Sequence, residues 1–480
     1  MKIEHHVAIP QIPNMKRTEF ASYQLAQYVS EGKIDTSDLT LRDAALRCLL
    51  DLIGAAIGGH ENYVASGSRG LAKTQFAQGR SSVWFSGELA GRTGAIVANS
   101  TAASVLDLDD GHRAARGHPG AAVIPAALAA AEELGASANE LLEAIIVGYE
   151  VSVRVAAASA PARKGYGYGS GRWAGYGVVA ALGRMLKLPA EQISQAFAIS
   201  GVLSPNLTAN GSAGYSDLMG NDVKEAIPWS AVTASSAIEL ARAGLTGPED
   251  LLDHAPHYSR EIALRDLGSS NAIKSVYFKP YSSCRYVHPA LAAFEPIIRD
   301  NKITPDEIRS VKIHTFQWAL DIDNRTDPRN LTEVQYSIPY CIALSALVGG
   351  DCMLPVTDSV LGRPEVTEFA KKVELILDPQ LEQRCPAETL ARVVVEARDQ
   401  IFESPVVAPR GEATNPMSWN DICDKFIVAT AAAMHEPQQR ELIKAVESVL
   451  EGDLGPLLVA LRQPLVYSRQ ANSKRPAIPS

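Results

Sequence analysis

The residues best suited to chemistry lie in a short charged block between two apolar segments. The block spans residues 107–120, reads DLDDGHRAARGHPG, and holds three aspartates, two histidines and two arginines. Residues 94–106 before it are almost all apolar or small, and residues 121–134 after it are rich in alanine. Because burying unpaired charge is expensive, so many ionisable groups at the end of an apolar helix indicate a functional site.

Two kinds of chemistry fit this block. Aspartates followed by a histidine in a loop bounded by glycine and proline could act as a general acid and base, or could bind a divalent metal ion. The sequence has no second cluster of His, Asp and Glu to supply the remaining metal ligands. We therefore predict acid–base chemistry and no metal.

Three further segments carry candidate groups. Residues 164–177 form a glycine–aromatic loop that leads into a helix, but no strand precedes it and no Lys-Ser/Thr pair follows, so it does not indicate a nucleotide site. Residues 217–224 end on Lys224, which taken alone is best interpreted as a solvated charge. Residues 279–289 combine cations, phenols and Cys284, a possible nucleophile for which no base lies nearby in sequence. An inert thiol is therefore the favoured interpretation.

Composition narrows the class of protein. The chain has 480 residues, 46% apolar and 21% charged, as in a soluble globular protein of two or three domains. Its net charge of −9 is spread along the chain, which argues against a nucleic-acid partner and a polybasic membrane patch. The six cysteines form no CxxC pair, and no apolar run resembles a signal peptide or a membrane span. We expect a cytoplasmic protein.

Apolar periodicity predicts the elements that position these groups. Helical spacing dominates residues 18–255, and it returns in residues 419–434 and 440–450. Between them, strands are predicted at 276–278, 311–315, 372–377 and 391–397, together with helices at 289–299, 336–348 and 364–371. The predicted fold is mainly α: a large all-helical domain (1–277 plus 412–480) with a smaller inserted α+β domain (278–411). The cleft between the domains is the expected site.

Taken together, the motifs resemble those of the MmgE/PrpD family, which includes 2-methylcitrate dehydratase, cis-aconitate decarboxylase and iminodisuccinate epimerase. The resemblance covers nearly the whole chain. It is carried by LDLIG at 50–54, DLDD at 107–110, HPG at 118–120, GYE at 148–150 with Arg154, the Lys224 segment, GLTGP at 244–248 and FKPY at 278–281. It implies a large helical domain with a smaller α+β lid, a homodimer, and catalysis without a metal or an organic cofactor.

The resemblance also implies site residues. The family's active-site aspartate and histidine fall on Asp107 and His118, and its two lysines fall on Lys224 and Lys279. A helix tyrosine falls on Tyr340. The remaining expected substrate-binding residues are Arg113, Cys284, Arg285 and His288.

Two positions depart from the family pattern. Tyr168 stands where dehydratase and decarboxylase members have a loop histidine, and Cys284 stands where many members have a histidine, with His288 four residues further on. A phenol has a reference pKa of about 10 rather than about 6.5. Tyr168 therefore suits a proton donor, or a base only if cations such as Lys224 lower its pKa.

The family's common chemistry, proton transfer at carbon next to a carboxylate, defines the expected function. We expect a cofactor-independent lyase that acts on a small di- or tricarboxylate, with dehydration as the first expectation. Cations would hold the carboxylates, and Asp107 would orient His118 as acid or base. The alternatives are an iminodisuccinate-type epimerase, a cis-aconitate-type decarboxylase, and a helical binding protein without catalysis.

Overall fold

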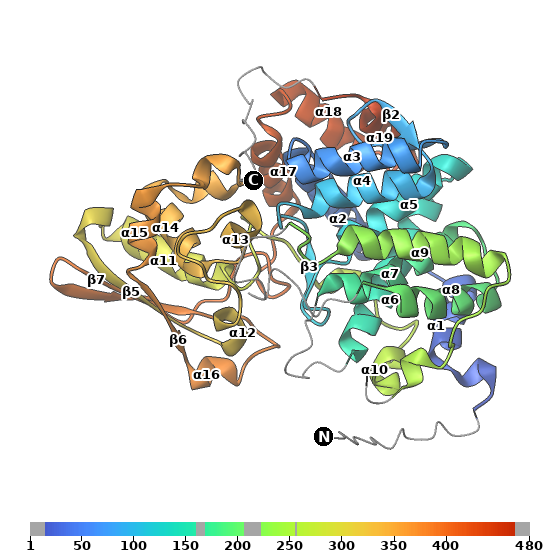
Figure 1. Cartoon of the computed structure of the whole chain (residues 1–480), viewed down its shortest axis with the longest axis horizontal. Helices are drawn as coiled ribbons and strands as arrows, with labels where there is room; N and C mark the ends of the chain where they lie inside the picture. The colour runs from blue at the N-terminus through green and yellow to red at the C-terminus, as the bar shows by residue number, and fades with distance from the viewer. Residues whose placement is uncertain (1–14, 160–168, 206–221, 255–256, 466–480) are drawn as a thin grey trace, which may run out of the picture.

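The computed structural model describes residues 15–159, 169–205, 222–254 and 257–465, and it is mainly α-helical. Nineteen α-helices lie in these residues, and every strand among them is short. Figure 1 shows a large helical part and a smaller part that contains a twisted sheet. The predicted mainly α fold class is confirmed.

The helical part is built from Ala- and Leu-rich segments that pack around one large core. Its main helices in chain order are α1 (Ala21–Glu31), α2 (Leu39–Gly59), α3 (Tyr63–Gln75), α4 (Arg92–Ser104), α5 (Gly120–Leu134), α6 (Ala138–Ala158), α7 (Ala174–Met185), α8 (Ala190–Leu203), α9 (Ile227–Arg242) and α10 (Arg260–Leu264). The part also holds a two-stranded ladder, β1 (Ser81–Val83) with β2 (Glu88–Ala90), which the sequence did not predict.

The smaller part contains a four-stranded sheet in the order β6-β5-β7-β8. Its strands are β5 (Ile308–Thr315), β6 (Val373–Leu377), β7 (Arg392–Ala397) and β8 (Gln400–Glu403). β5 pairs parallel with β6 and antiparallel with β7. Helix α11 (His288–Asp300) packs on β7, and α14 (Ile338–Leu347) packs on α11, which builds a second core. The shorter helices here are α12 (Gln317–Leu320), α13 (Leu331–Gln335), α15 (Pro364–Ala370) and α16 (Pro379–Glu382).

The end of the chain returns to the helical part. Helices α17 (Trp419–Thr430), α18 (Glu436–Glu447) and α19 (Gly455–Arg462) lie on it, red in Figure 1. Helix α17 packs against α2, where Phe426 lies close to Gly54. The exact domain boundaries stay a prediction. Within the described residues, no helix has both the length and the apolar content needed to cross a membrane.

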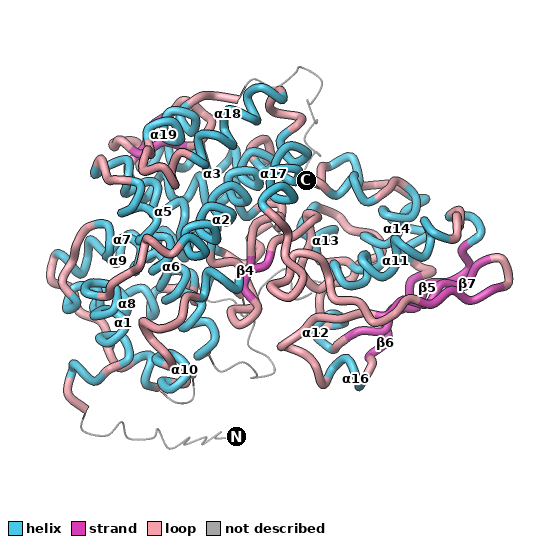
Figure 2. Tube along the Cα trace, turned by 180° about the vertical axis from the view of Figure 1, so that it is seen from behind, coloured by secondary structure: helices cyan, strands magenta, loops and turns pink. Residues whose placement is uncertain are grey.

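A second short ladder lies at the junction of the two parts. Here β3 (Gly111–His112), which follows the three aspartates of the charged block, pairs antiparallel with β4 (Val276–Tyr277). Figures 1 and 2 show β3 and β4 between the helical part and the sheet. The predicted strand at 276–278 thus pairs with the charged block. It brings the segment that follows it, which begins with Lys279, close to the aspartates.

Candidate active site

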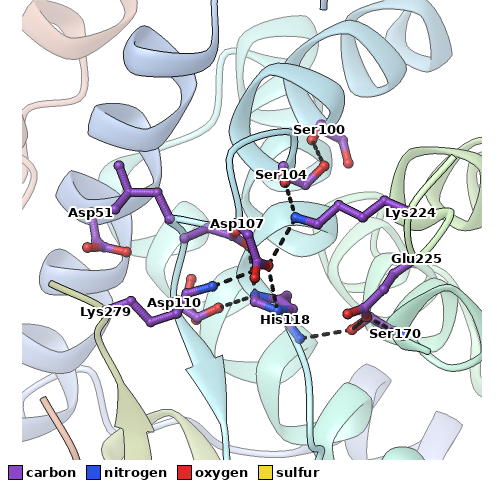
Figure 3. A network of polar contacts seen from close by, with 12 residues as sticks. Asp51, Ser100, Ser104, Asp107, Asp110, His118, Ser170, Lys224, Glu225 and Lys279 are labelled. Atoms are coloured by element: carbon purple, nitrogen blue, oxygen red, sulfur yellow. Dashed lines mark hydrogen bonds and ion pairs between the residues drawn. The ribbon is translucent and has the colours of Figure 1, made fainter. Parts of the chain in front are cut away.

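Asp107 is the centre of the site. It lies just after α4 in the left-handed region, with φ 54°, a conformation that aspartate tolerates better than most residues. Its side chain is fully buried. Three cationic or titratable nitrogens lie around Oδ1: Lys224 Nζ at 3.0 Å, Lys279 Nζ at 3.3 Å and His118 Nε2 at 3.3 Å (Figure 3). The structure therefore brings together four of the residues predicted from sequence.

His118 lies between two carboxylates. Its Nδ1 is 3.3 Å from Asp109 Oδ2 and 3.1 Å from the carbonyl oxygen of Asp110. Burial and the Lys279 charge act to lower the pKa of His118, but the charges of Asp109 and Asp107 outweigh them, so the pKa is raised. The two neighbouring carboxylates therefore favour the imidazolium form of His118, which can donate a proton.

Neighbouring charges also set the pKa of Asp107. Burial acts to raise the pKa of Asp107, but Lys224, Lys279 and His118 outweigh it and hold that pKa well below its usual value. Lys224 also donates from Nζ to the carbonyl oxygen of Ser104 at 2.6 Å. Asp107 is therefore an ionised carboxylate that fixes three surrounding groups.

Several buried polar atoms at this centre have no hydrogen bond among the described residues. They are Lys279 Nζ, Asp107 Oδ2 and both carboxylate oxygens of Asp109. The Lys279 side chain is fully buried, and its ion pair with Asp107 lacks hydrogen-bond geometry. Buried polar groups are nearly always satisfied in folded proteins, so such a cluster indicates where a polar ligand binds.

A series of hydrogen bonds that the sequence did not predict holds the backbone of His118. The backbone N–H of His118 donates to Ser170 Oγ at 3.1 Å, and Ser170 Oγ donates to Glu225 Oε2 at 2.5 Å (Figure 3). Glu225 Oε1 accepts from the Tyr336 hydroxyl at 3.0 Å. Glu225, the neighbour of Lys224, therefore links the His118 loop to the sheet-containing part.

A second unforeseen support comes from the end of the chain. Lys425 on α17 donates from Nζ to Asp51 Oδ1 at 2.5 Å and to the carbonyl oxygen of Leu108 at 2.8 Å. Both side chains are buried. Lys425 therefore fixes the backbone between Asp107 and Asp109.

Asp110 differs from the other two aspartates of the block. Burial, with the charges of Asp51 and Asp109, raises the pKa of Asp110 well above its usual value. Its oxygens accept from the Tyr149 hydroxyl at 3.0 and 3.1 Å. Burial therefore favours the neutral form of Asp110, whereas the pKa values of Asp107 and Asp109 are lowered, which favours their ionised forms.

Two predicted cations lie elsewhere. Arg113 and Arg285 both contact the carboxylate of Glu412, Arg285 through Nε at 2.8 Å. The Arg285 guanidinium also lies over the Tyr277 ring, 4.7 Å from its centroid. Neither arginine contacts Asp107 or His118 in the described residues, so a role in holding substrate at that centre stays a prediction.

The remaining predicted residues differ in position and state. Burial raises the pKa of the Cys284 thiol to about 12, which argues against a thiolate nucleophile. Burial, Arg285 and Lys279 lower the pKa of His288 well below its usual value, and its Nε2 lies 3.1 Å from Ser283 Oγ. The Tyr340 hydroxyl donates to the carbonyl oxygen of Val360 at 2.6 Å, inside the second core. Tyr168 lies outside the described residues.

The same centre also holds groups that could bind a metal ion. Within the described residues, Asp107, Asp109 and His118 form the one group of possible ligands, with ligand atoms within 4.8 Å of one another. Lys224 and Lys279 place two ammonium groups on the same carboxylate oxygen. Their charge opposes a divalent cation there, so the arrangement fits an anion better.

Comparisons with known proteins identify the family of the chain. The model of the MmgE/PrpD N-terminal domain matches residues 23–260, and that of the MmgE/PrpD C-terminal domain matches residues 281–451. The chain is 25% identical over 418 residues to a cis-aconitate decarboxylase of Aspergillus terreus, covering 79% of this chain and 83% of the relative. It is 26% identical over 459 residues to the cis-aconitate decarboxylase of Homo sapiens, covering 89% and 91%. The chain therefore belongs to the MmgE/PrpD family.

Proposed function

We propose that the chain is a lyase that acts on a small di- or tricarboxylate by proton transfer at carbon next to a carboxylate, without a metal or an organic cofactor. The observation that carries the proposal is the fully buried Lys279 ammonium, which lacks a hydrogen bond among the described residues. It shares the Asp107 carboxylate with His118, whose pKa is raised. A substrate carboxylate would supply the missing acceptor.

Each group has a role in this proposal. Lys224 and Lys279 bind a substrate carboxylate and stabilise the negative charge that develops on it when the neighbouring carbon loses a proton. Asp107 holds both ammonium groups and His118 in place. His118 is the general acid. Tyr168 stays a candidate for the proton-accepting group.

Dehydration is the first candidate reaction. Hydroxide is a poor leaving group, so the reaction needs an acid, and His118 is placed to supply the proton. The carbon next to the carboxylate loses its proton, the C–O bond on the adjacent carbon breaks, and the departing oxygen takes the proton of His118 to leave as water. The products are an alkene and water. An imidazolium held between Asp107 and Asp109 suits this step.

Decarboxylation is the second candidate, and the cis-aconitate decarboxylase relatives favour it. Here the C–C bond to a carboxylate breaks, carbon dioxide leaves, and His118 gives its proton to the carbon. This reaction uses the same acid and the same lysines. The two candidates differ in product and not in the charged groups required.

Proton NMR in deuterated water with a panel of di- and tricarboxylates separates the reactions. An alkene formed with loss of water supports dehydration, and release of carbon dioxide supports decarboxylation. Deuterium exchange at a stereocentre without either product would instead identify an epimerase, and no change in any substrate would contradict the lyase proposal.

Matched variants test the assigned centre. His118→Gln and Lys279→Met should each abolish turnover, whereas Lys371→Met, on an exposed lysine paired with Glu368, should leave it unchanged. Thermal unfolding of each variant checks that the fold is intact. Turnover near that of the wild type in His118→Gln would overturn the site assignment.

A further inference from the structure

A cavity lies against Lys224 where the two parts of the molecule meet, and we call it the junction cavity. It is lined by residues 62–64, 68, 101, 104–105, 222–229 and 331–332. Its walls therefore come from the start of α3, the end of α4, the segment that leads into α9, and α13 of the sheet-containing part. Its volume is about 450 Å³, within the range of small-molecule sites.

One wall of the junction cavity belongs to the candidate active site. Lys224 and Ser104 both line the cavity, and Lys224 Nζ donates to the carbonyl oxygen of Ser104 at 2.6 Å. The same ammonium lies 3.0 Å from Asp107 Oδ1, and Figure 3 shows the Lys224 side chain directed toward Asp107 and Ser104. A ligand whose carboxylate binds at Lys224 therefore has the junction cavity beside it.

The segment that places Lys224 in this wall has an unfavourable backbone conformation. Lys224 and Ala226 both have φ 54°, in the left-handed region. Non-glycine residues held in this region cost free energy, and such positions cluster at functional sites. Glu225 lies between them and accepts hydrogen bonds from Ser170 and Tyr336, which hold the segment in place. The wall is thus maintained at a cost, as expected where a ligand is bound.

The charged groups of the described lining already have protein partners. Lys224 and Glu225 are engaged as above, and Asp222 Oδ1 accepts from Asn330 Nδ2 at 3.3 Å. Partial burial and a hydrogen bond to Asp222 raise the pKa of Tyr63, so this phenol is neutral at ordinary pH. Besides Lys224, these residues offer no cation to a second carboxylate, and two acidic side chains would repel one.

The rest of the described lining suits a hydrocarbon. Trp229 and Tyr63 carry large rings that are 51% and 49% exposed. Val64, Val105 and Leu331 add aliphatic surface. Covering such surface with an apolar group removes it from water, which is favourable. The cavity therefore fits an uncharged, apolar part of a ligand whose charged end lies at Lys224.

We propose that the substrate carries an uncharged hydrocarbon substituent, which lies in the junction cavity against Tyr63, Trp229 and Leu331 while a carboxylate binds at Lys224. This inference rests on the proposed function. It narrows the substrate class from small di- or tricarboxylates in general to those that bear an alkyl or aryl group. Trp229 and Leu331 are then specificity-determining residues.

Isothermal titration of the full-length protein with succinate, propylsuccinate and hexylsuccinate tests the proposal. The three probes share two carboxylates, have no hydroxyl to lose, and differ only in the alkyl substituent. The affinity of the wild type should rise by about threefold to fourfold for each methylene that the cavity buries. Hexan-1-ol, which has the chain without the carboxylates, should bind at least about tenfold more weakly than hexylsuccinate.

Four variants locate the substituent. Trp229→Ala and Leu331→Ala should each lower the ratio of hexylsuccinate affinity to succinate affinity by about tenfold and leave succinate binding unchanged. Lys224→Met should weaken the binding of all three succinates by a similar factor. Ile401→Ala, on an exposed side chain of β8, should bind all of them as the wild type does. Thermal unfolding checks each fold, and the exposed Trp229 keeps the test decisive should Leu331→Ala unfold.

The outcomes separate this inference from the lyase proposal. An affinity that does not rise from succinate to hexylsuccinate would overturn the inference, as would a rise that is unchanged in both Trp229→Ala and Leu331→Ala. So would unchanged hexylsuccinate binding in Lys224→Met, because the chain would then bind apart from the site. A rise that Trp229→Ala removes, in a protein that converts no carboxylate, would refute the lyase reaction alone, whereas turnover without the rise would refute the substituent alone.

Discussion

Replacing Asp109 by asparagine should lower the pKa of His118. The carboxylate of Asp109 lies beside Nδ1 of His118 and is the first of the groups that raise its pKa, against burial and the Lys279 charge. Asparagine has the same shape but no charge. The variant therefore removes one electrostatic contribution and leaves Asp107 and both lysines in place.

The size of the effect follows from the geometry. Asp109 Oδ2 lies 3.3 Å from His118 Nδ1. Two unit charges at that separation attract by about 5 kcal/mol at an effective dielectric constant of about 20, which is an upper bound. A single neighbouring carboxylate shifts a pKa by about 1 to 3 units in proteins. We expect the pKa of His118 to fall by an amount in that range.

Two assays measure this shift with a defined sign. A general acid works in its protonated form, so activity is lost as the pH rises through the pKa of His118. In Asp109→Asn the high-pH limb of the kcat/KM profile should move to lower pH by about 1 to 3 units. NMR titration of the His118 Cε1–H signal gives the same pKa without relying on turnover.

Asp110→Asn is the matched control. Burial and the charges of Asp51 and Asp109 raise the pKa of Asp110, which favours its neutral form, so an amide there should change less charge than at Asp109. Its oxygen can still accept from Tyr149. The pKa of His118 should stay the same in this variant. An unchanged pKa in Asp109→Asn, or an equal fall in Asp110→Asn, would refute the reasoning.

Four further predictions follow from the same contacts. Lys224→Met should lower kcat/KM by about 100-fold, because a desolvated charge contact to substrate and Asp107 is lost, and activity near that of the wild type would contradict its role. The stability contributed by the raised pKa of His118 is complete below its unfolded pKa of about 6.5 and is lost as pH rises through the folded pKa. The stability contributed by the lowered pKa of Asp107 is complete above its unfolded pKa of about 3.9 and is lost as pH falls through the folded pKa. Urea unfolding across pH should show both slopes, and His118→Gln should remove the first. Lys425→Met should destabilise the fold by about 3 to 5 kcal/mol in urea unfolding, because it leaves Asp51 buried and unpaired, and a loss below about 1 kcal/mol would show that Asp51 needs no partner. Turnover should be unchanged by a chelator, and loss restored by a divalent metal would show that the reaction needs one.

The fold could be predicted where local signals are strong. Helices α6 and α8 lie in the segment whose spacing predicts helices, and Ser137 with Glu140 forms a capping box that marks the start of α6. Helix α3 has a weak local signal because its sequence contains glycine at 67 and 70, and it is stabilised by packing on α4. Strand β8 was missed because it is mostly exposed and shows no alternation.

The site could be predicted only in part. Asp107, His118, Lys224 and Lys279 stand in recognisable motifs, and the structure places them together. Ser170 and Glu225 stand in no such motif. Their hydrogen bond forms between two segments that are 55 residues apart in the sequence. Which charge faces which is decided by tertiary packing.

Arg285 shows the same limit of local sequence patterns. Its position in a cation-rich motif indicates a substrate contact, which stays a prediction. The structure also gives it an ion pair with Glu412, 127 residues away, that no local pattern indicates. The preference of guanidinium for a bidentate carboxylate partner is general, whereas the identity of that partner is not encoded locally.

Lys425 has a consequence for the synthesis of the chain. The carbonyl oxygen that it holds, on Leu108, precedes it by 317 residues. Asp107 and the three residues around it leave the ribosome long before Lys425 does, yet the contact that holds the backbone between Asp107 and Asp109 forms only when α17 has docked on α2. A chain truncated before α17 therefore carries the charged groups without the contact that fixes the backbone at Leu108.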